Sequence, residues 1–501
     1  MIEGFRRRVD DVHKVDHVVA RWAGRRPPSP ADAVLQGLGT AANHSLLWLV
    51  IVAGLAVKKG TSRRAALRGA LALAATSCTA NAVLKPVLPR RRPPVEQDPP
   101  NSSSLPSGHA ASAAAFVTAV ALESRKAGLV LAPLAAAVAY SRIRVGAHWM
   151  SDVTVGAVLG SGVALSTRRW WPVRRTDEAL ARPHGDAPVL PDGAGLVLVA
   201  NPRSGAPGHD PADEIAEALP AATVLRTTEG VDLDDQLEAA LAAGDAARAV
   251  GVAGGDGTVA AAAAVAGRHG LPLAVVPTGT LNHFARDVGV YDLQEAVDAT
   301  QAGEAVAVDL GVVQIHGAGR APHTRYFLNT ASLGGYSDLV RLRERWEGSL
   351  GKWLAFAAAL VVSLRQARPL RVKLDGQEQR LWLLFVGNGP YHPRGMVPAW
   401  RPRLDSGLLD IRYLRADRRF SRARAIIALL LGAMQHTRTY VQREAPSLDV
   451  ELIGDPVSLA TDGEILAEAG RFTFRIADRP IAVYRRDERN WPNRARPHLP
   501  W

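Results

Sequence analysis

The stretch Ser141–Asp152, SRIRVGAHWMSD, gathers a histidine, an aspartate and two arginines within twelve residues. His148 and Asp152 are four residues apart, and at that spacing we expect both side chains on one face of a helix. The carboxylate would hold one imidazole nitrogen and leave the other free as a nucleophile. Arg142, on the other side of Gly146, could bind a phosphate. Because a lone pair at this spacing is commonly only a surface pair, the neighbouring stretches decide its meaning.

Two earlier stretches add an anion-binding environment. Lys85–Pro93, KPVLPRRRP, is rich in cations, and Pro106–His109, PSGH, opens a run of small and apolar residues. A Ser-Gly turn at a helix N-terminus presents backbone N–H groups that favour anions. Together with the histidine stretch, these residues offer two imidazoles, several cations and a helix end to one phosphate group.

Read as KxxxxxxRP, PSGH and SRxxxxxHxxxD, the three stretches resemble the type 2 phosphatidic acid phosphatase superfamily, with every motif position filled. The resemblance implies that His148 attacks phosphorus and becomes phosphohistidine, that Asp152 orients it, and that His109 protonates the leaving oxygen. The residues implied to bind phosphate are Lys85, Arg92, Ser107, Gly108 and Arg142. The resemblance implies no cofactor, and the region agrees in lacking a cluster of carboxylates or histidines at metal-ligand spacing. A vanadate-dependent haloperoxidase uses the same motif types and is the alternative for this half.

The composition favours a membrane partner. The 501 residues suffice for about three domains, and the net charge of +12 suits an anionic surface. Lipid fits better than nucleic acid, because no helix-turn-helix, finger or base-stacking pattern is visible. Cys78 is the single cysteine, which excludes a disulfide framework and a cysteine-based metal site. Met1–Lys14 is highly charged, so we expect no cleavable secretion signal.

Apolar runs rich in alanine, glycine and serine fill the first third of the chain. Each is short for a membrane span of roughly 20 residues, but small residues let membrane helices approach closely. We therefore predict an all-α membrane bundle, with a soluble helical bundle as the alternative. The runs are 46–57, 65–84, 109–122, 127–140 and 153–167.

Basic residues follow the first and fifth runs and separate the third from the fourth. If every run spans, these segments share one side, which the positive-inside rule assigns to the cytoplasm. The phosphatase motifs then meet on the external side. Five spans would leave the basic N-terminus outside, so we expect a sixth span or an interfacial helix within 10–45.

Glycine turns directly after apolar runs recur three times beyond residue 195. Leu196–Ala200 leads into NPRSG, Ala249–Ala253 into GGDGT, and Leu273–Val276 into PTGTLN. Strands alternating with helical stretches predict an α/β sheet. Glycines after a strand let the backbone approach a phosphate, whose charge the next helix N-terminus stabilises. The match to dinucleotide and Walker motifs is poor, which argues against a dehydrogenase or an ordinary P-loop enzyme.

This set of turns resembles the diacylglycerol kinase catalytic family, which shares its nucleotide fold with NAD kinases and sphingosine kinases. The bacterial lipid kinase pattern continues over roughly 195–486. The resemblance implies a nucleotide domain, a β-sandwich and an active site in the cleft between them. The further matching stretches are FLNTASLG at 327–334, GNG at 387–389, DSGLLD at 405–410 and TDGE at 461–464.

The same resemblance implies ATP and Mg²⁺. Asp462 would take the proton from the acceptor hydroxyl, with Glu464 beside it, while magnesium bridges the phosphates. Asp405 resembles a position that holds a structural magnesium. Taken one at a time, these aspartates could equally be residues that only form turns. His283 stands where many members carry aspartate, which leaves the acidic metal network and the acceptor lipid open. The residues implied to hold the nucleotide are Asn201, Ser204, Gly205, Gly254, Gly255, Asp256, Gly257, Thr258, Thr278, Gly279 and Thr280.

We therefore predict a lipid phosphate phosphatase fused to an ATP-dependent lipid kinase that acts on a diacylglycerol-like or sphingoid-like hydroxyl. The alternative is a phosphatase carrying a kinase-like module that binds lipid without catalysis. Because the two activities oppose each other, we expect the bilayer to separate them, with the kinase in the cytoplasm. The predicted segments are a helical membrane bundle (1–175), a polar linker (176–194), an α/β nucleotide domain (195–305), a β-sandwich lipid domain (306–486) and a loose tail (487–501).

Overall fold

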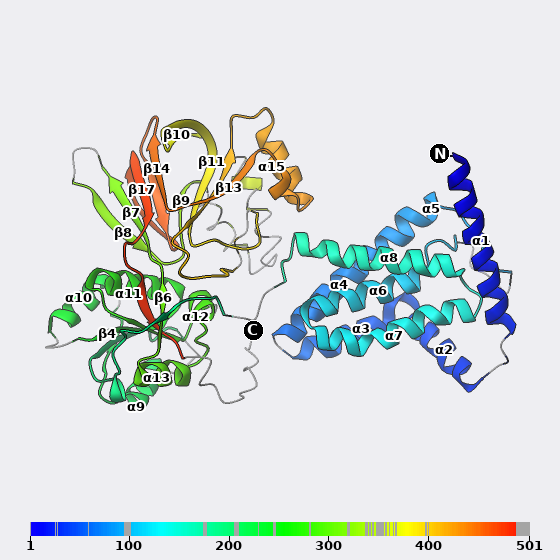
Figure 1. Ribbon diagram of the computed structural model, residues 1–501, viewed down its shortest axis with the longest axis horizontal. Helices are drawn as coiled ribbons and strands as arrows, with labels where there is room; N and C mark the ends of the chain where they lie inside the picture. Colours follow the sequence, from blue (N-terminus) through cyan, green and yellow to red (C-terminus); the bar gives the residue numbers. More distant parts are fainter. Residues whose placement is uncertain are drawn as a thin grey trace. The chain divides into compact units, whose positions relative to one another are not determined.

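The chain folds into two compact units, Met1–Val173 and Arg174–Pro497 (Figure 1). The predicted tail at 487–501 lies outside the described residues. The computed structural model describes residues 2–486 except 26, 28, 59, 95–101, 174–177, 205–209, 229, 244–246, 280–281, 318–320, part of 336–367, 396–397 and 399.

The first unit is helical, as the apolar runs predict. Helix α6 packs against α4, α7 and α8 (Figure 1). A Cβ atom on Gly156 of α8 would lie 2.5 Å from the carbonyl oxygen of Ser107, so α8 and the start of α6 approach as closely as glycine permits. The helices are α1 (Ile2–Arg25), α2 (Pro30–Ala41), α3 (Leu46–Val57), α4 (Thr61–Cys78), α5 (Lys85–Val87), α6 (Gly108–Glu123), α7 (Arg125–Arg144) and α8 (Met150–Ser166).

The number of candidate membrane spans is smaller than the five or six that the sequence predicts. Among the described residues, Thr61–Val87 and Arg125–Arg144 are long and apolar enough to cross a membrane. The bent pair Pro30–Ala41 and Leu46–Val57 makes a third if it counts as one span. Length explains the difference, because α6 and α8 have only 16 and 17 residues and a span needs roughly 20.

The second unit contains a mostly parallel sheet with strand order β1-β6-β18-β5-β4-β2-β3. Because β5, β4 and β2 are adjacent and parallel, the three turns that follow them meet at one edge. The strands are β1 (Pro183–His184), β2 (Leu196–Ala200), β3 (Thr223–Arg226), β4 (Ala249–Gly254), β5 (Leu273–Pro277), β6 (Ala305–Val308) and β18 (Ile481–Tyr484). The helices are α9 (Pro211–Ala218), α10 (Leu233–Ala243), α11 (Asp256–His269), α12 (His283–Val288) and α13 (Leu293–Ala302).

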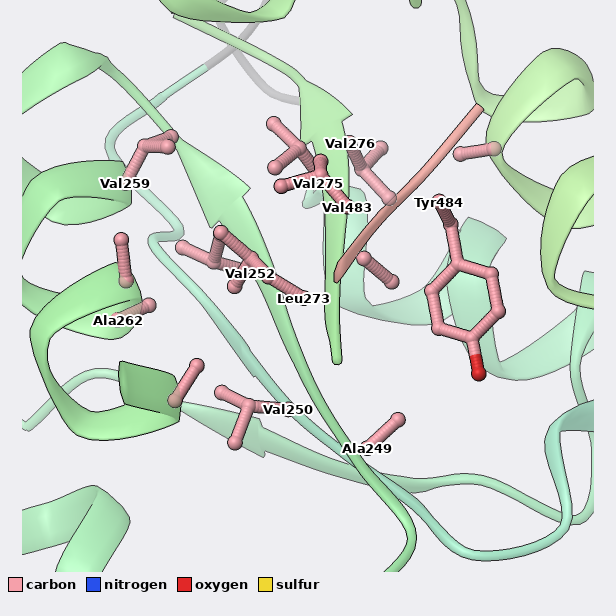
Figure 2. Close-up of a cluster of buried hydrophobic side chains, with 14 of the residues drawn as sticks. Ala249, Val250, Val252, Val259, Ala262, Leu273, Val275, Val276, Val483 and Tyr484 are labelled. Atoms are coloured by element: carbon pink, nitrogen blue, oxygen red, sulfur yellow. The ribbon is translucent and has the colours of Figure 1, made fainter. Parts of the chain in front are cut away.

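An apolar core anchors these strands (Figure 2). Val252 of β4 and Val275 of β5 pack with Ala262 of α11 and with Val483 and Tyr484 of β18. All five are nearly inaccessible to solvent, and burying each valine contributes about 1.5–3 kcal/mol. The core therefore fixes the strand ends from which the glycine turns project.

The remaining strands form an antiparallel sheet in the order β16-β15-β9-β11-β10-β14-β17-β7-β8, with β12 pairing with β11 and β13. Its aromatic and aliphatic side chains, among them Phe472 and Phe474, form a separate core. Helix α15 (Ser421–Leu430) follows β12. The strands are β7 (Gly311–His316), β8 (His323–Phe327), β9 (Thr330–Gly334), β10 (Leu370–Leu374), β11 (Gln377–Asn388), β12 (Leu409–Arg415), β13 (Tyr440–Ala445), β14 (Ser447–Leu452), β15 (Val457–Thr461), β16 (Glu464–Ala469) and β17 (Arg471–Ile476).

Two segments differ from their predicted roles. The described part of the predicted polar linker packs into the second unit, where Leu190 is fully buried and β1 pairs with β6. Strand β18, expected in the β-sandwich, joins the nucleotide sheet between β5 and β6. Both segments make contacts with residues distant in sequence, which local composition does not reveal.

Candidate active sites

His148 lies in the loop between α7 and α8, not on a helix as the four-residue spacing predicts. Helix α8 begins at Met150, so only Asp152 of the pair is helical. The Nδ1 atom of His148 lies 2.7 Å from the carbonyl oxygen of Ser104 and 3.7 Å from Oδ2 of Asp152. A proton on Nδ1 would therefore be donated to the Ser104 carbonyl, which leaves Nε2 with its lone pair.

The three phosphatase stretches meet around this loop. The N–H of Ser107 donates to the carbonyl oxygen of Asp152 at 3.0 Å, and Arg92 donates to the carbonyl oxygen of Ala147 at 3.0 Å. The Lys85 ammonium nitrogen is 3.9 Å from the place where a Cβ of Gly108 would stand. Residues that are far apart in sequence are thus held within one small region.

Other members of the predicted set surround the same place. The backbone carbonyl of Arg142 accepts the N–H of His148 at 3.2 Å, and its guanidinium lies beside Gly39 of α2. His109, on the first turn of α6, has its Nε2 2.8 Å from Oδ1 of Asn43. Ser107 is fully buried, and its hydroxyl has no hydrogen-bond partner among the described residues.

Burial also sets the charge state of the histidine. It lowers the pKa of His148 below the ordinary 6.5, while the Asp152 carboxylate acts in the opposite direction. The ring is therefore neutral near pH 7, the state in which Nε2 is a nucleophile.

Sequence reasoning missed two residues of this region. Arg90 donates to the carboxylate of Asp152 at 2.6 Å and to that of Asp16 at 2.7 Å. Arg90 is one of three consecutive arginines, so its position alone does not distinguish it from Arg91 or Arg92. Asp16 belongs to α1, and no local pattern connects it to residues more than 70 positions away.

In the second unit the three glycine turns interlock. The hydroxyls of Ser204 and Thr278 lie 2.7 Å apart and join the first turn to the third. A Cβ on Gly279 would stand 2.6 Å from the Cα of Gly255, so the second and third turns touch through their backbones. Asp256 Oδ1 accepts the N–H of Phe284 at 3.1 Å and so holds the start of α12. Gly205 and Thr280, both predicted to bind nucleotide, lie outside the described residues.

A cavity of about 420 Å³ is lined both by residues of the first two turns and by the predicted base. Asn201, Gly257 and Thr258 line it from the α/β sheet, and Asp462 and Glu464 line it from the hairpin of β15 and β16. The predicted set is thus partly assembled around one space. Further polar residues that line the cavity and were not predicted are Thr227, Asp232, Asp234, Arg268, Arg325 and Tyr326.

Asp462 is both the hairpin turn former and a cavity residue. Its backbone is in the left-handed region, with φ of 47°, and its carboxylate accepts the N–H groups of Leu328, Asn329 and Thr330 at 2.6 to 2.9 Å. Burial raises its pKa above the ordinary value of 3.8, and the three donors act in the opposite direction. The carboxylate therefore has a fixed orientation and a raised proton affinity.

Arg401 holds the turn that binds Asp462, and sequence reasoning missed it. The buried guanidinium donates to the carbonyl oxygen of Leu328 at 3.0 Å and to the side chain of Asn329 at 3.3 Å. It also pairs with Asp287 of α12 at 3.1 Å. One arginine therefore connects the nucleotide domain to the backbone groups that orient the predicted base.

Asp405 does not fit the predicted metal role. Its buried carboxylate accepts Nε of Arg182 at 2.7 Å and Nε of Arg403 at 2.6 Å, so both of its oxygens are already paired with a guanidinium. Among the described residues, no group of three or more His, Cys, Asp or Glu side chains is arranged to hold a metal. A magnesium ion at the catalytic cavity would therefore depend on phosphate oxygens for most of its ligands.

Two family models match separate parts of the chain. The PAP2 superfamily model matches residues 65–176, and the diacylglycerol kinase catalytic domain model matches 195–313. A diacylglycerol kinase of Mycobacterium tuberculosis is 28% identical over 284 residues, covering 54% of this chain and 88% of the relative. A probable lipid kinase YegS-like of Pseudomonas aeruginosa is 31% identical over 267 residues, covering 52% of this chain and 82% of the relative.

Two solved structures are similar to parts of the chain. A diacylglycerol kinase from Bacillus anthracis has 21% identity and a TM-score of 0.39, and covers 58% of this chain and 96% of its own. A transmembrane PAP2 type phosphatidylglycerolphosphate phosphatase from Bacillus subtilis has 24% identity and a TM-score of 0.28, with 31% and 83% covered. From the family matches and the lipid kinase relative, the chain belongs to the diacylglycerol kinase catalytic family and carries a PAP2 superfamily domain in the same polypeptide.

Proposed function

We propose that the chain is a bifunctional membrane enzyme that removes phosphate from a lipid phosphate ester and transfers phosphate from ATP to a lipid hydroxyl. The observation that supports this proposal is that one chain holds two separate clusters of residues suited to binding phosphate. One surrounds the loop of His148, and the other lies where residues of the first two glycine turns face Asp462 across a cavity.

In the phosphatase, Nε2 of His148 would attack phosphorus while Nδ1 is held by the Ser104 carbonyl near Asp152. His109 would protonate the leaving oxygen, and water would then hydrolyse the phosphohistidine. The fully buried Ser107 hydroxyl, unpartnered among the described residues, supports an anion beside it. Cations of the predicted set, such as Lys85 near Gly108, would neutralise charge on the equatorial oxygens.

In the kinase, the cavity would hold the triphosphate of ATP. No atom lies within 4 Å of the Cβ positions of Gly255 and Gly257, so phosphate can approach the backbone N–H groups at the start of α11. Mg²⁺, which takes one or two carboxylates with phosphate oxygens, would be held by Asp462 or Glu464 and would neutralise phosphate charge. Asp462 would accept the proton of the acceptor hydroxyl. Its three backbone donors fix the carboxylate toward that role.

A radiolabelled ATP assay against a panel of diacylglycerols and sphingoid bases tests the kinase, and phosphate release from short-chain phosphatidic acid without ATP tests the phosphatase. We expect His148→Ala to remove only the phosphatase activity and Asp462→Asn to remove only the kinase activity. A chain that releases phosphate but never labels a lipid would instead favour a kinase-like module that binds without catalysis. Halide oxidation with added vanadate would favour a haloperoxidase.

A further inference from the structure

A carboxylate from the N-terminal helix reaches the nucleophile region through one arginine. Arg90 donates Nη1 to Oδ1 of Asp152 at 2.6 Å and Nη2 to Oδ2 of Asp16 at 2.7 Å. The side chains of Asp16 and Asp152 are 2% and 0% exposed. Two buried carboxylates thus share one guanidinium, whose charge offsets part of the cost of burying them.

Asp16 also caps the first turn of α8. The first N–H groups of a helix have no partner within the helix, and the N-cap residue Trp149 supplies no side-chain acceptor for them. Asp16 of α1 accepts the N–H of Ser151 at 2.9 Å and its hydroxyl at 2.7 Å. It therefore performs, from another helix, the capping that a local Ser or Asp ordinarily provides.

These contacts constrain the histidine through Asp152. One oxygen of Asp152 is bound by Arg90, and the other accepts the N–H of Trp149 at 3.0 Å and lies 3.7 Å from Nδ1 of His148. With both oxygens assigned, the carboxylate cannot rotate without losing a hydrogen bond. The orientation of the carboxylate beside the imidazole thus depends on Arg90, which is held in turn by Asp16.

We propose that Asp16 and Arg90 are positioning residues for the His148–Asp152 pair, so that helix α1 completes the phosphatase site. The proposal rests on the proposed phosphatase function. It extends the site beyond the residues 65–176 that the superfamily model matches. Neither Asp16 nor Arg90 would contact the phosphate. Arg90 would hold Asp152, which orients His148, and Asp16 would hold Arg90.

The test is a double-mutant cycle on the full-length chain in detergent, without ATP, with dioctanoyl phosphatidic acid as substrate and phosphate release as readout. We expect Asp16→Asn to lower kcat about 10- to 100-fold, with KM and the inhibition constant of inorganic phosphate changed less than about twofold. In an Asp152→Asn background, Asp16→Asn should have almost no further effect, because both residues act through one network.

Two variants make the result decisive. Asp11→Asn is the matched control, because Asp11 is on the same helix, is exposed and pairs only with Lys14 among the described residues. If Asp16→Asn does not fold, Arg90→Lys keeps the charge but cannot fork between two carboxylates, and we expect a folded protein with lowered kcat. An unchanged kcat in a folded variant would overturn the proposal. So would a fold-loss of kcat from Asp16→Asn that is as large in the Asp152→Asn background as in the wild-type chain. A wild-type chain no more active than His148→Ala would instead refute the phosphatase function itself.

Discussion

Asp462 has a structural role at its hairpin in addition to the chemical role that we propose for it. Replacing Asp462 with Asn turns one acceptor into an N–H₂ group that faces backbone donors, at a cost of about 1–3 kcal/mol. It also removes the proposed proton acceptor, so we expect kinase turnover to fall about 10²- to 10⁴-fold. Lipid labelling from ATP measures the loss. Asp455→Asn is the control, because Asp455 is exposed; full turnover in the Asp462 variant would rule out the proposed role.

His148 gives a prediction about pH. Burial lowers the pKa of His148, so the neutral nucleophile persists as pH falls below the ordinary 6.5. We expect the acid limb of phosphatase kcat/KM to lie below pH 6.5. Since the Asp152 carboxylate raises this pKa, the residual activity of Asp152→Asn should show an acid limb at still lower pH. A limb that moves upward would contradict the assignment.

Two glycines in the turns of the nucleotide domain should respond in opposite ways to substitution by alanine. A methyl on Gly279 would stand 2.6 Å from the Cα of Gly255, so Gly279→Ala should force the turns apart and destabilise the fold by about 1–3 kcal/mol. Gly257 has open space and a helical backbone, so Gly257→Ala should gain up to about 1 kcal/mol. Its methyl would enter the cavity and raise KM for ATP. Thermal unfolding midpoints and ATP kinetics of the two variants test these expectations. An equal loss of stability in Gly279→Ala and Gly257→Ala would contradict this packing.

The elements also show what the sequence could predict. Strands followed by glycine turns are local patterns, and all three predicted copies lie on adjacent parallel strands. The four-residue spacing of His148 and Asp152 misled because Gly146, with φ of 75°, follows the end of α7 and α8 starts only at Met150. Asp16 and Arg401 act through contacts across more than 70 residues, for which no spacing rule exists. Their roles follow only from the packed structure.

The folded kinase unit begins before the first residue that the family model matches. The family model begins at residue 195, yet Leu190 is fully buried and Tyr484 donates to the carbonyl oxygen of Pro188 at 2.8 Å. We expect a fragment 178–486 to unfold cooperatively and a fragment 195–486 to unfold at a clearly lower temperature. Leu190→Ala in the full chain should cost about 2–5 kcal/mol. Equal thermal midpoints for the two fragments would show that the segment contributes nothing.

The opposed reactions give a test of sidedness that uses both sites at once. If both faced one aqueous side, lipid would be phosphorylated and dephosphorylated repeatedly, with net hydrolysis of ATP. We therefore propose that the bilayer separates them. In sealed vesicles with ATP on the kinase side, we expect phosphorylated lipid to accumulate with little phosphate release. Adding detergent should start steady ATP hydrolysis, and the His148→Ala variant should not show it. Equally fast ATP hydrolysis before detergent is added would place both sites on the same side.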